Sequence, residues 1–338
     1  MRVVWFATLL GLAAAACDRG HPREKPSKPM PNAAPLAPPA AGPAAADVGV
    51  AAGACTLAVL PLSRPMPRRL VAIGDLHGDL AGARSALRAA GAIDDGDRWI
   101  GGDLVVVQTG DVLDRGDDEQ AILDLVAKLE REAQATGGAL IMLLGNHELM
   151  NAAGDFRYVA PGALSDFDDA AGADRAKYPE APQAVRGRLA ALGPGGAYAK
   201  RLAEHAVIAI VGDTVFSHAG VLGDWVTQVE EANRSARCWL DGQAGGIEAR
   251  PLVLTSETSP VWTRAVGFDA DCEQAKAALA ALGVKRMVVG HTVQREINAA
   301  CDGTVWRIDV GLGKGYGGPI QVLELVPGAP PKVIAGTR

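Results

Sequence analysis

Six side chains that can bind metal ions stand in short glycine-rich stretches between residues 75 and 291. Each stretch places a carboxylate, an imidazole or a carboxamide near a glycine, which lets the backbone approach a ligand closely. Mixed oxygen and nitrogen donors suit manganese, iron or zinc better than magnesium or calcium, which prefer oxygen alone. Two such ions about 3.5 to 4 Å apart can hold a hydroxide between them and bind the attacking and leaving oxygens of an in-line phosphoryl displacement. The six residues are Asp75, His77, Asp111, Asn146, His218 and His291.

Short apolar runs with a preference for β-structure come directly before these stretches. Strands that are covered on both faces of a sheet are nearly all apolar, as these runs are. Gly212 and Asp213 separate two of the runs, which predicts a tight hairpin with His218 at its exit. Because functional side chains of α/β folds collect at strand ends, we expect these ends to meet at one sheet edge and form a pocket. The predicted strands cover residues 70–73, 104–108, 140–144, 206–211, 214–216 and 286–289.

Helices are predicted between these strands. Apolar residues recur at helical spacing over residues 118–135, and shorter helices are expected up to about residue 90 and over about 272–282. Between residues 151 and 202 the pattern loosens into polar segments with Pro and Gly, which predicts a mostly helical or irregular insertion near the substrate cleft. The tail offers two further strands, over about residues 304–310 and 320–326.

Five motifs in a fixed order carry a resemblance to a known family. They are GDLHG from residue 74, GDVLDRG from residue 110, GNHE from residue 145, HAG from residue 218 and GHT from residue 290. Together they resemble the calcineurin-like metallophosphoesterase superfamily, and the second and third forms resemble its phosphoprotein phosphatases. The sequence is most similar to the bacterial Shewanella-like phosphatases, to which the SPVWTR segment from residue 259 and residues 309–318 also point. The resemblance implies an α/β fold, a four-layer αββα sandwich of two mixed β-sheets flanked by helices.

The resemblance also implies a ligand set for each of two metal ions. Asp75, His77 and Asp111 would bind the first ion, and Asp111 would bridge to the second, which Asn146, His218 and His291 would complete. Many relatives outside the phosphoprotein group end in GHxH, and their second His joins the first metal. Val293 stands at that place here, so the first ion should keep open or water-filled positions.

By the same resemblance, four side chains act on the phosphate. His147 would be the general acid that protonates the leaving oxygen, and Asp114 would orient it. Arg115 would bind phosphate oxygens as a planar fork. Arg264 is a candidate second phosphate clamp, with an ordinary ion pair to a carboxylate as the alternative.

Several other conspicuous residues have simpler interpretations. His21 and His205 lie outside the motifs and are interpreted as ordinary surface or core residues. Residues 311–318 are glycine-rich but lack a strand-to-helix context, so they predict a flexible loop near the cleft rather than a dinucleotide site. The tryptophans at positions 225, 239 and 262 could bind a phosphoaromatic substrate, but core packing is the preferred interpretation.

The N-terminus predicts export. Arg2 precedes an apolar run over residues 3–16, which is too short to span a bilayer comfortably and has the form of a secretory signal. Small residues before Cys17 resemble a lipobox, so residues 1–17 predict a lipoprotein signal peptide, with a plain signal peptide as the alternative. Residues 18–54 are rich in Pro and Ala and predict a linker. We therefore expect a periplasmic protein or a lipoprotein anchored in the inner or outer membrane, with the catalytic domain over residues 55–338.

Composition limits the partners. The formal net charge is −6 and no run of Lys or Arg forms a basic stripe, so nucleic acid is not an expected partner. The expected substrate is a protein or peptide phosphorylated on Ser, Thr or Tyr, or a small phosphomonoester. The alternatives are a diadenosine polyphosphate or nucleotide hydrolase and a non-catalytic envelope binding protein.

Four cysteines beyond Cys17 could form one or two disulfides in an oxidising compartment, or remain buried thiols. They are Cys55, Cys238, Cys272 and Cys301.

Overall fold

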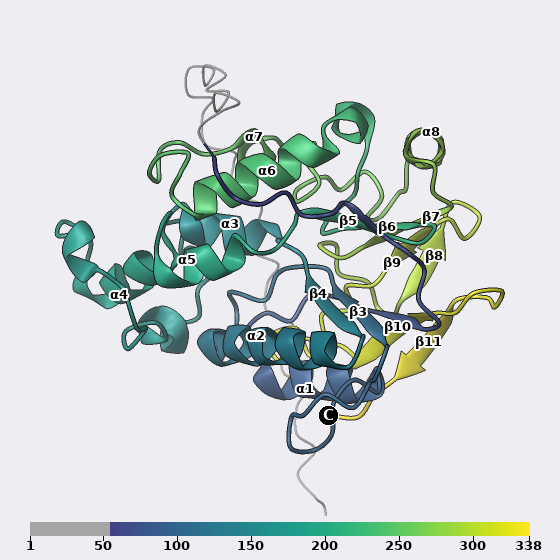
Figure 1. The fold of residues 1–338 in the computed structure, drawn as a ribbon, viewed down its shortest axis with the longest axis horizontal. Helices are drawn as coiled ribbons and strands as arrows, with labels where there is room; N and C mark the ends of the chain where they lie inside the picture. Colours follow the sequence, from purple (N-terminus) through teal and green to yellow (C-terminus); the bar gives the residue numbers. More distant parts are fainter. Residues whose placement is uncertain (1–54) are drawn as a thin grey trace, which may run out of the picture. The chain divides into compact units, whose positions relative to one another are not determined.

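Two mixed β-sheets pack against each other with helices on their outer faces, in the computed structural model that describes residues 55–338 (Figure 1). The five-stranded sheet has the order β11-β10-β2-β3-β4. Its strands β2, β3 and β4 are parallel, and β10 and β11 are antiparallel to their neighbours. The strands are β2 (Leu70–Ile73), β3 (Val105–Gln108), β4 (Ala139–Met142), β10 (Gln321–Leu325) and β11 (Lys332–Ala335).

The second sheet has six strands in the order β1-β5-β6-β7-β9-β8. The predicted hairpin is confirmed, because β5 and β6 pair antiparallel around Gly212, which adopts a left-handed φ of 60°. Strand β7 then runs parallel to β6. The strands are β1 (Ser63–Arg64), β5 (Ile208–Val211), β6 (Thr214–Ser217), β7 (Arg286–Val289), β8 (Asn298–Ala300) and β9 (Val305–Arg307).

Helices complete the four layers that the family resemblance implies (Figure 1). Helices α1 (Leu80–Ala89) and α2 (Glu119–Ala135) pack on the five-stranded sheet, and α6 (Val229–Leu240) packs on the other sheet. The insertion predicted between residues 151 and 202 contains short 3-10 helices and two α-helices. The remaining helices are α3 (Asn146–Ala152), α4 (Gln183–Leu192), α5 (Ala197–Leu202), α7 (Leu252–Thr255) and α8 (Cys272–Leu282), with 3-10 helices over Pro161–Ser165, Arg175–Lys177 and Gly223–Thr227.

One apolar core joins the sheets and their helices. All four residues of β2 are buried, because the strand lies between two neighbouring strands and both faces of its sheet are covered. Core side chains from both sheets, such as Ile73 and Phe216, are almost fully buried. The strand ends that carry the polar motifs are therefore attached to a closely packed support.

The expectation of a single sheet edge is corrected by the topology. Asp75, Asp111 and Asn146 follow β2, β3 and β4 of one sheet, whereas His218 and His291 follow β6 and β7 of the other. Packing of the two sheets brings these strand ends together, so the pocket is built by both sheets. A sequence pattern gives the end of a strand but not the sheet to which the strand belongs.

Two disulfides settle the pairing that the sequence left open. Cys55 pairs with Cys238, and Cys272 pairs with Cys301. The signal segment, the lipobox-like Cys17 and the linker lie outside the described residues. Among residues 55–338, no helix is both long and apolar enough to span a bilayer.

Candidate metal centre

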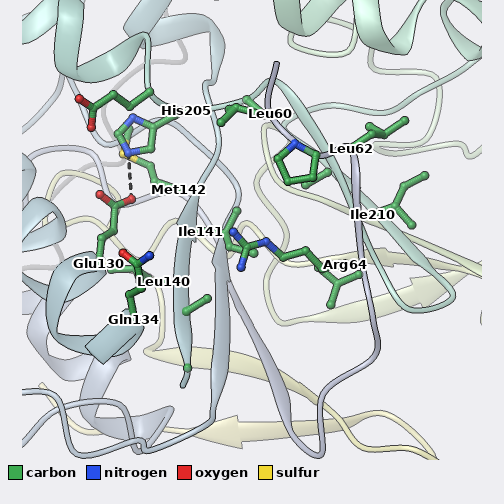
Figure 2. A pocket seen from close by; sticks show the side chains of 17 residues that line it. Leu60, Leu62, Arg64, Glu130, Gln134, Leu140, Ile141, Met142, His205 and Ile210 are labelled. Carbon is green, nitrogen blue, oxygen red and sulfur yellow. Dashed lines mark hydrogen bonds and ion pairs between the residues drawn. The ribbon is translucent and has the colours of Figure 1, made fainter. Parts of the chain in front are cut away.

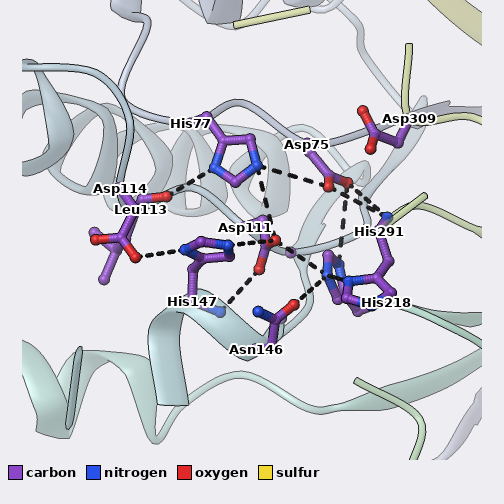
Figure 3. A network of polar contacts seen from close by, with 12 residues as sticks. Asp75, His77, Asp111, Leu113, Asp114, Asn146, His147, His218, His291 and Asp309 are labelled. Carbon is purple, nitrogen blue, oxygen red and sulfur yellow. Dashed lines mark hydrogen bonds and ion pairs between the residues drawn. The ribbon is translucent and has the colours of Figure 1, made fainter. Parts of the chain in front are cut away.

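The six predicted ligands lie together at the ends of the strands, around Asp111 (Figure 3). Two groups of three side chains could each hold a metal ion, and within each group the ligand atoms lie within 4.8 Å of one another. Asp111 belongs to both groups: one also contains His77 and His147, and the other contains His218 and His291. A carboxylate shared in this way can bridge two ions.

Hydrogen bonds behind the imidazoles set which nitrogen faces the centre. The Nδ1 atom of His77 lies 3.0 Å from the Leu113 carbonyl oxygen, and that of His218 lies 2.9 Å from the Thr109 carbonyl oxygen. A carbonyl only accepts, so in the neutral ring each Nδ1 carries the proton and each Nε2 offers its lone pair. His291 is turned the other way, because its Nε2 lies 3.2 Å from the Trp262 carbonyl oxygen and leaves Nδ1 as the donor atom for a metal.

The lone pair of His218 faces other acceptors. Its Nε2 lies 2.9 Å from Asn146 Oδ1, 3.1 Å from Asp111 Oδ2 and 3.1 Å from His291 Nδ1. Electron-rich atoms at these distances repel one another unless a cation or a proton lies among them. Burial lowers the pKa of His218, but the Asp111 carboxylate outweighs burial and the pKa is raised. The donor set therefore fits a divalent cation.

Asp75 and Asp309 add buried negative charge beside the two groups (Figure 3). Asp75 Oδ2 lies 4.0 Å from His77 Nε2 and accepts the backbone N–H of His291 at 3.2 Å. Asp309 Oδ1 accepts the backbone N–H of Gly311, but Oδ2 is buried without a partner among the described residues. Burial raises the pKa of Asp75 well above its usual range, and the nearby Asp309 and Asp111 carboxylates raise it further. A bound cation would offset this charge.

Asp309 was not among the predicted site residues. It follows β9, so its position after a strand resembles that of the recognised ligands. That signal was present in the sequence, but it stood outside the five motifs.

Glu148 holds two of the ligand-bearing loops together. Its buried carboxylate accepts backbone N–H groups of Gly145, Asp111, Val112 and Leu113 at 2.7 to 3.1 Å. Gly145 must be a glycine, because a Cβ at this position would lie 2.1 Å from Asp111 Oδ1. The GNHE and GDVLDRG motifs therefore form one interlocked unit.

His147 lies beside the ligands and is tied to Asp114. Its Nδ1 is hydrogen-bonded to Asp114 Oδ2, while its Nε2 lies 3.7 Å from Asp111 Oδ2 and faces the centre. Burial lowers the pKa of His147, but the Asp111 and Asp114 carboxylates outweigh burial, so the pKa is raised. This environment favours an imidazole that carries a proton next to the centre.

Arg115 lies between two aromatic rings. Its guanidinium carbon is 4.7 Å from the ring centroid of Tyr158 and 5.2 Å from that of Tyr316. Among the described residues it has no acidic partner, and its Nε is buried without a hydrogen bond. Stacking fixes the plane of the guanidinium without using its N–H groups. An anion such as phosphate can therefore use them.

Comparison with known proteins decides the family. A family model described as calcineurin-like phosphoesterase matches residues 68–295. The chain belongs to this family. Shewanella-like protein phosphatase 2 of Arabidopsis thaliana is 42% identical to it over 295 residues, covering 77% of this chain and 75% of that protein. Shewanella-like protein phosphatase 1 of Plasmodium berghei is 29% identical over 265 residues, covering 74% and 69% of the two chains.

A solved structure supports the fold independently. The cold-active protein-tyrosine phosphatase of a psychrophilic Shewanella species aligns with a TM-score of 0.63, over 80% of this chain and 78% of that chain, at 24% identity. The phosphoesterase therefore has the predicted two-sheet architecture. It is a metal-dependent phosphatase, and its two ligand groups fit the dinuclear divalent site of the family.

Arg264 of the phosphoesterase lies at the edge of the centre. Its Nη1 donates to Thr292 Oγ1 at 3.1 Å and contacts the His291 carbonyl oxygen at 3.5 Å. It forms no ion pair with a carboxylate in the part of the chain that the structure describes. The alternative of an ordinary ion pair is therefore not supported by the geometry.

The predicted glycine-rich loop lies next to the centre, where Tyr316 covers Arg115 and Gly313 approaches His77. Trp239 is fully buried in the core and Trp225 nearly so, as the packing interpretation predicts. Trp262 is only partly buried: it packs against the core, and its ring centroid lies 6.0 Å from that of His291. The sequence offered no motif for Tyr158, which lies just beyond helix α3 at the start of the insertion.

His205 lies away from the metal centre. It lines a cavity of about 280 Å³ between β4, β5 and the segment that leads into β1 (Figure 2). Its Nε2 is bonded to Glu130 Oε1 of helix α2 at 2.9 Å. Its Nδ1 is buried without a hydrogen-bond partner among the described residues, so His205 is a partly buried residue outside the metal site, as interpreted, but only one of its ring nitrogens is satisfied.

Proposed function

We propose that this phosphoesterase removes phosphate from phosphorylated Ser, Thr or Tyr side chains of proteins or peptides. Its relatives in Arabidopsis and Plasmodium are described as protein phosphatases, and the solved neighbour is described as a protein-tyrosine phosphatase. The observation that carries the proposal is the junction at Asp111, where two ligand groups meet beside an arginine that has no acidic partner among the described residues. This arrangement offers places for two cations and for the anion that they would bind.

The ligands divide into two sets in this proposal. Asp75 and His77 would hold one ion, Asn146, His218 and His291 would hold the other, and Asp111 would contribute to both. Manganese, iron or zinc suits these mixed donors. When bound, the ions would supply an activated water and neutralise phosphate charge.

His147 is the general acid in this proposal. Its Nε2 faces the centre, and the hydrogen bond to Asp114 orients the ring and stabilises its protonated form. Arg115 binds two phosphate oxygens with the N–H groups that stacking leaves free. Arg264 contributes a second guanidinium next to His291 and Thr292.

Turnover of p-nitrophenyl phosphate and of a phosphopeptide panel tests the proposal, with manganese, iron and zinc added in turn to metal-free protein. We expect activity that depends on metal and is lost in Asp111→Ala. His147→Ala should lower kcat on phosphopeptides by roughly 10²- to 10⁴-fold, the usual contribution of general acid catalysis. Full activity of the metal-free enzyme would contradict the proposal.

Two alternatives have separate tests. A diadenosine polyphosphate hydrolase would turn over diadenosine tetraphosphate faster than any phosphopeptide in the panel. A non-catalytic envelope binding protein would show no turnover with any of the three metals. Metal analysis that finds about two ions per chain would argue against the second alternative.

We also propose that the protein is exported. The disulfides Cys55–Cys238 and Cys272–Cys301 are consistent with an oxidising compartment. Cell fractionation of the full chain and of Cys17→Ala tests the anchor: the parent should follow the membrane and the variant should not. A parent found in the soluble fraction would leave only the plain signal peptide.

A further inference from the structure

A fully buried arginine of the insertion reaches the pair formed by Asp114 and His147. Arg188 lies on helix α4, far along the chain from the metal motifs. We propose that Arg188 is a positioning residue that holds the Asp114 carboxylate in the orientation required by His147. The inference rests on the proposed role of His147 as the general acid.

Contacts of the guanidinium carry the inference. Nη2 of Arg188 forms an ion pair with Asp114 Oδ1 at 3.5 Å but makes no hydrogen bond among the described residues, and Nε donates to Asn151 Oδ1 at 2.8 Å. Asn151 in turn donates from Nδ2 to Asp114 Oδ1 at 2.9 Å and to the His147 carbonyl oxygen at 2.9 Å. Asn151, held by Arg188, therefore hydrogen-bonds Oδ1 of Asp114 beside the guanidinium charge, so that Oδ2 is the oxygen that faces His147 Nδ1.

A second buried carboxylate belongs to the same network. Arg188 Nη1 pairs with Glu119 Oε2 and donates to the Ala163 carbonyl oxygen at 3.1 Å. Glu119 Oε1 accepts the backbone N–H of Asp114 at 2.5 Å, and Asp114 has a left-handed φ of 69°. Arg188 therefore fixes both the side chain of Asp114 and, through Glu119, a backbone conformation that non-glycine residues seldom adopt.

The surroundings of Arg188 favour a specific role. Its guanidinium carbon lies 5.7 Å from the ring centroid of Phe156 and 5.2 Å from that of Phe167. Two carboxylates and an amide are reached by one planar fork, an arrangement that a lysine ammonium cannot reproduce. The alternative is that the buried charge serves only to attach the insertion to the domain.

Leaving-group dependence separates these two roles. A p-nitrophenolate leaves readily without a proton, whereas the more basic phenolate depends on the general acid. A misplaced Asp114 should therefore impair hydrolysis of phenyl phosphate more than that of p-nitrophenyl phosphate. Simple loosening of the insertion should affect both substrates alike.

The experiment compares kcat/KM for these two substrates in the metal-loaded full chain. Arg188→Lys keeps the charge and is the main variant, and Arg188→Gln is added if it folds by circular dichroism. Leu189→Ala is the matched control, because Leu189 is buried on the same helix but packs in the small cluster with Tyr178 and Ala181. His147→Ala is the reference for complete loss of the acid.

We expect Arg188→Lys to lower the ratio of phenyl to p-nitrophenyl turnover roughly tenfold, a part of the contribution expected from the acid itself. Leu189→Ala should leave the ratio unchanged. In the His147→Ala background, Arg188→Lys should change the ratio no further, because both substitutions would act through one group.

Four results would overturn the inference. A ratio of phenyl to p-nitrophenyl turnover in Arg188→Lys that equals the parent's would show that Arg188 only attaches the insertion to the domain. An equal fall of this ratio in Leu189→Ala would show the same. An additive effect in the double variant would show that Arg188 acts independently of His147. If His147→Ala itself left the ratio unchanged, the proposed acid would fail together with the inference, whereas absent turnover in the parent would mean that the proposed function has failed.

Discussion

Residues of the site adopt a backbone conformation that side chains usually avoid. His77, Asp111, Asp114, Arg115 and His291 all have φ between 47° and 70°. Such positions cost of order 1–3 kcal/mol each and persist only where the surroundings enforce them. The left-handed residues turn the chain sharply after a strand, which helps to aim ligands from different strands at one centre. Hydrogen bonds to buried carboxylates such as Glu148 and Glu119 hold several of these turns in place.

Tyr316 should support Arg115 through its ring rather than its hydroxyl. A cation–π contact contributes about 0.5–2 kcal/mol, which corresponds to roughly 2- to 30-fold in binding. We therefore expect Tyr316→Ala to raise KM for phosphopeptides within this range, whereas Tyr316→Phe stays close to the parent. Steady-state kinetics of the three proteins provide the measurement. Equal losses in both variants would assign the effect to the hydroxyl group instead.

Metal ligands could be predicted from the sequence because each is embedded in a local motif with glycine. The residues that support them could not, since their partners are distant along the chain. Arg188 meets Glu119 across 69 positions and Asp114 across a larger separation. Nothing in the local pattern of helix α4 distinguishes this arginine from Arg186, whose side chain bonds to nearby backbone carbonyls.

At the scale of elements, strands with buried faces were predicted well and exposed ones were missed. β2 and β7 agree with the predicted bounds because continuous apolar runs mark them. β1 consists of two exposed residues and β11 is mostly exposed, so neither has an apolar signal. Helix α6 was also missed, although its buried Val229, Ala232 and Ala236 follow helical spacing.

Helix α2 is attached to the turn before β5 by the bond between Glu130 and His205, and this contact should depend on pH. Burial lowers the pKa of His205, but the hydrogen bond and charge of Glu130 outweigh burial and raise the pKa above its usual value. A histidine with a raised pKa contributes stability below its unfolded pKa of about 6.5, and that contribution is lost as pH rises through the folded pKa.

Glu130→Gln should therefore destabilise the protein more at about pH 6 than at about pH 9, by up to roughly 1.5–3 kcal/mol. Urea unfolding at both pH values measures the difference. Glu180→Gln is the control, because Glu180 is an exposed residue of the insertion and should show no such dependence. A constant effect of Glu130→Gln across the range would show that the charge of His205 does not contribute.

At the scale of the whole molecule, the centre depends on how the two sheets pack. β2, β3 and β4 deliver four ligands and β6 and β7 deliver two, so the site forms only when both sheets are assembled. The order of the motifs indicated that their residues meet, through resemblance to a family. Local periodicity could not assign the strands to two sheets, because it carries no information on which strands become neighbours.

Metal binding should therefore stabilise the entire domain. The assembled centre gathers the buried carboxylates Asp75, Asp111 and Asp309 with few compensating positive charges, and a ligand that binds only the folded state shifts unfolding toward higher temperature. Manganese at about 100 times its Kd should add about 2.7 kcal/mol per site, or roughly 5–10 °C in Tm for a domain of this size.

Asp111→Asn tests whether stabilisation by manganese depends on the carboxylate that the two ligand groups share. The amide keeps the oxygen that accepts the backbone N–H of His147, at 3.0 Å in the parent, but removes the charge between the two ligand groups. We expect the variant to fold without metal and to lose most of the manganese-induced rise in Tm, measured by differential scanning calorimetry on chelator-treated protein. Asp269→Asn, at an exposed carboxylate, should respond as the parent does. A full response in Asp111→Asn would mean that manganese stabilises the domain elsewhere, because loss of the charge shared by both ligand groups should weaken both ions together.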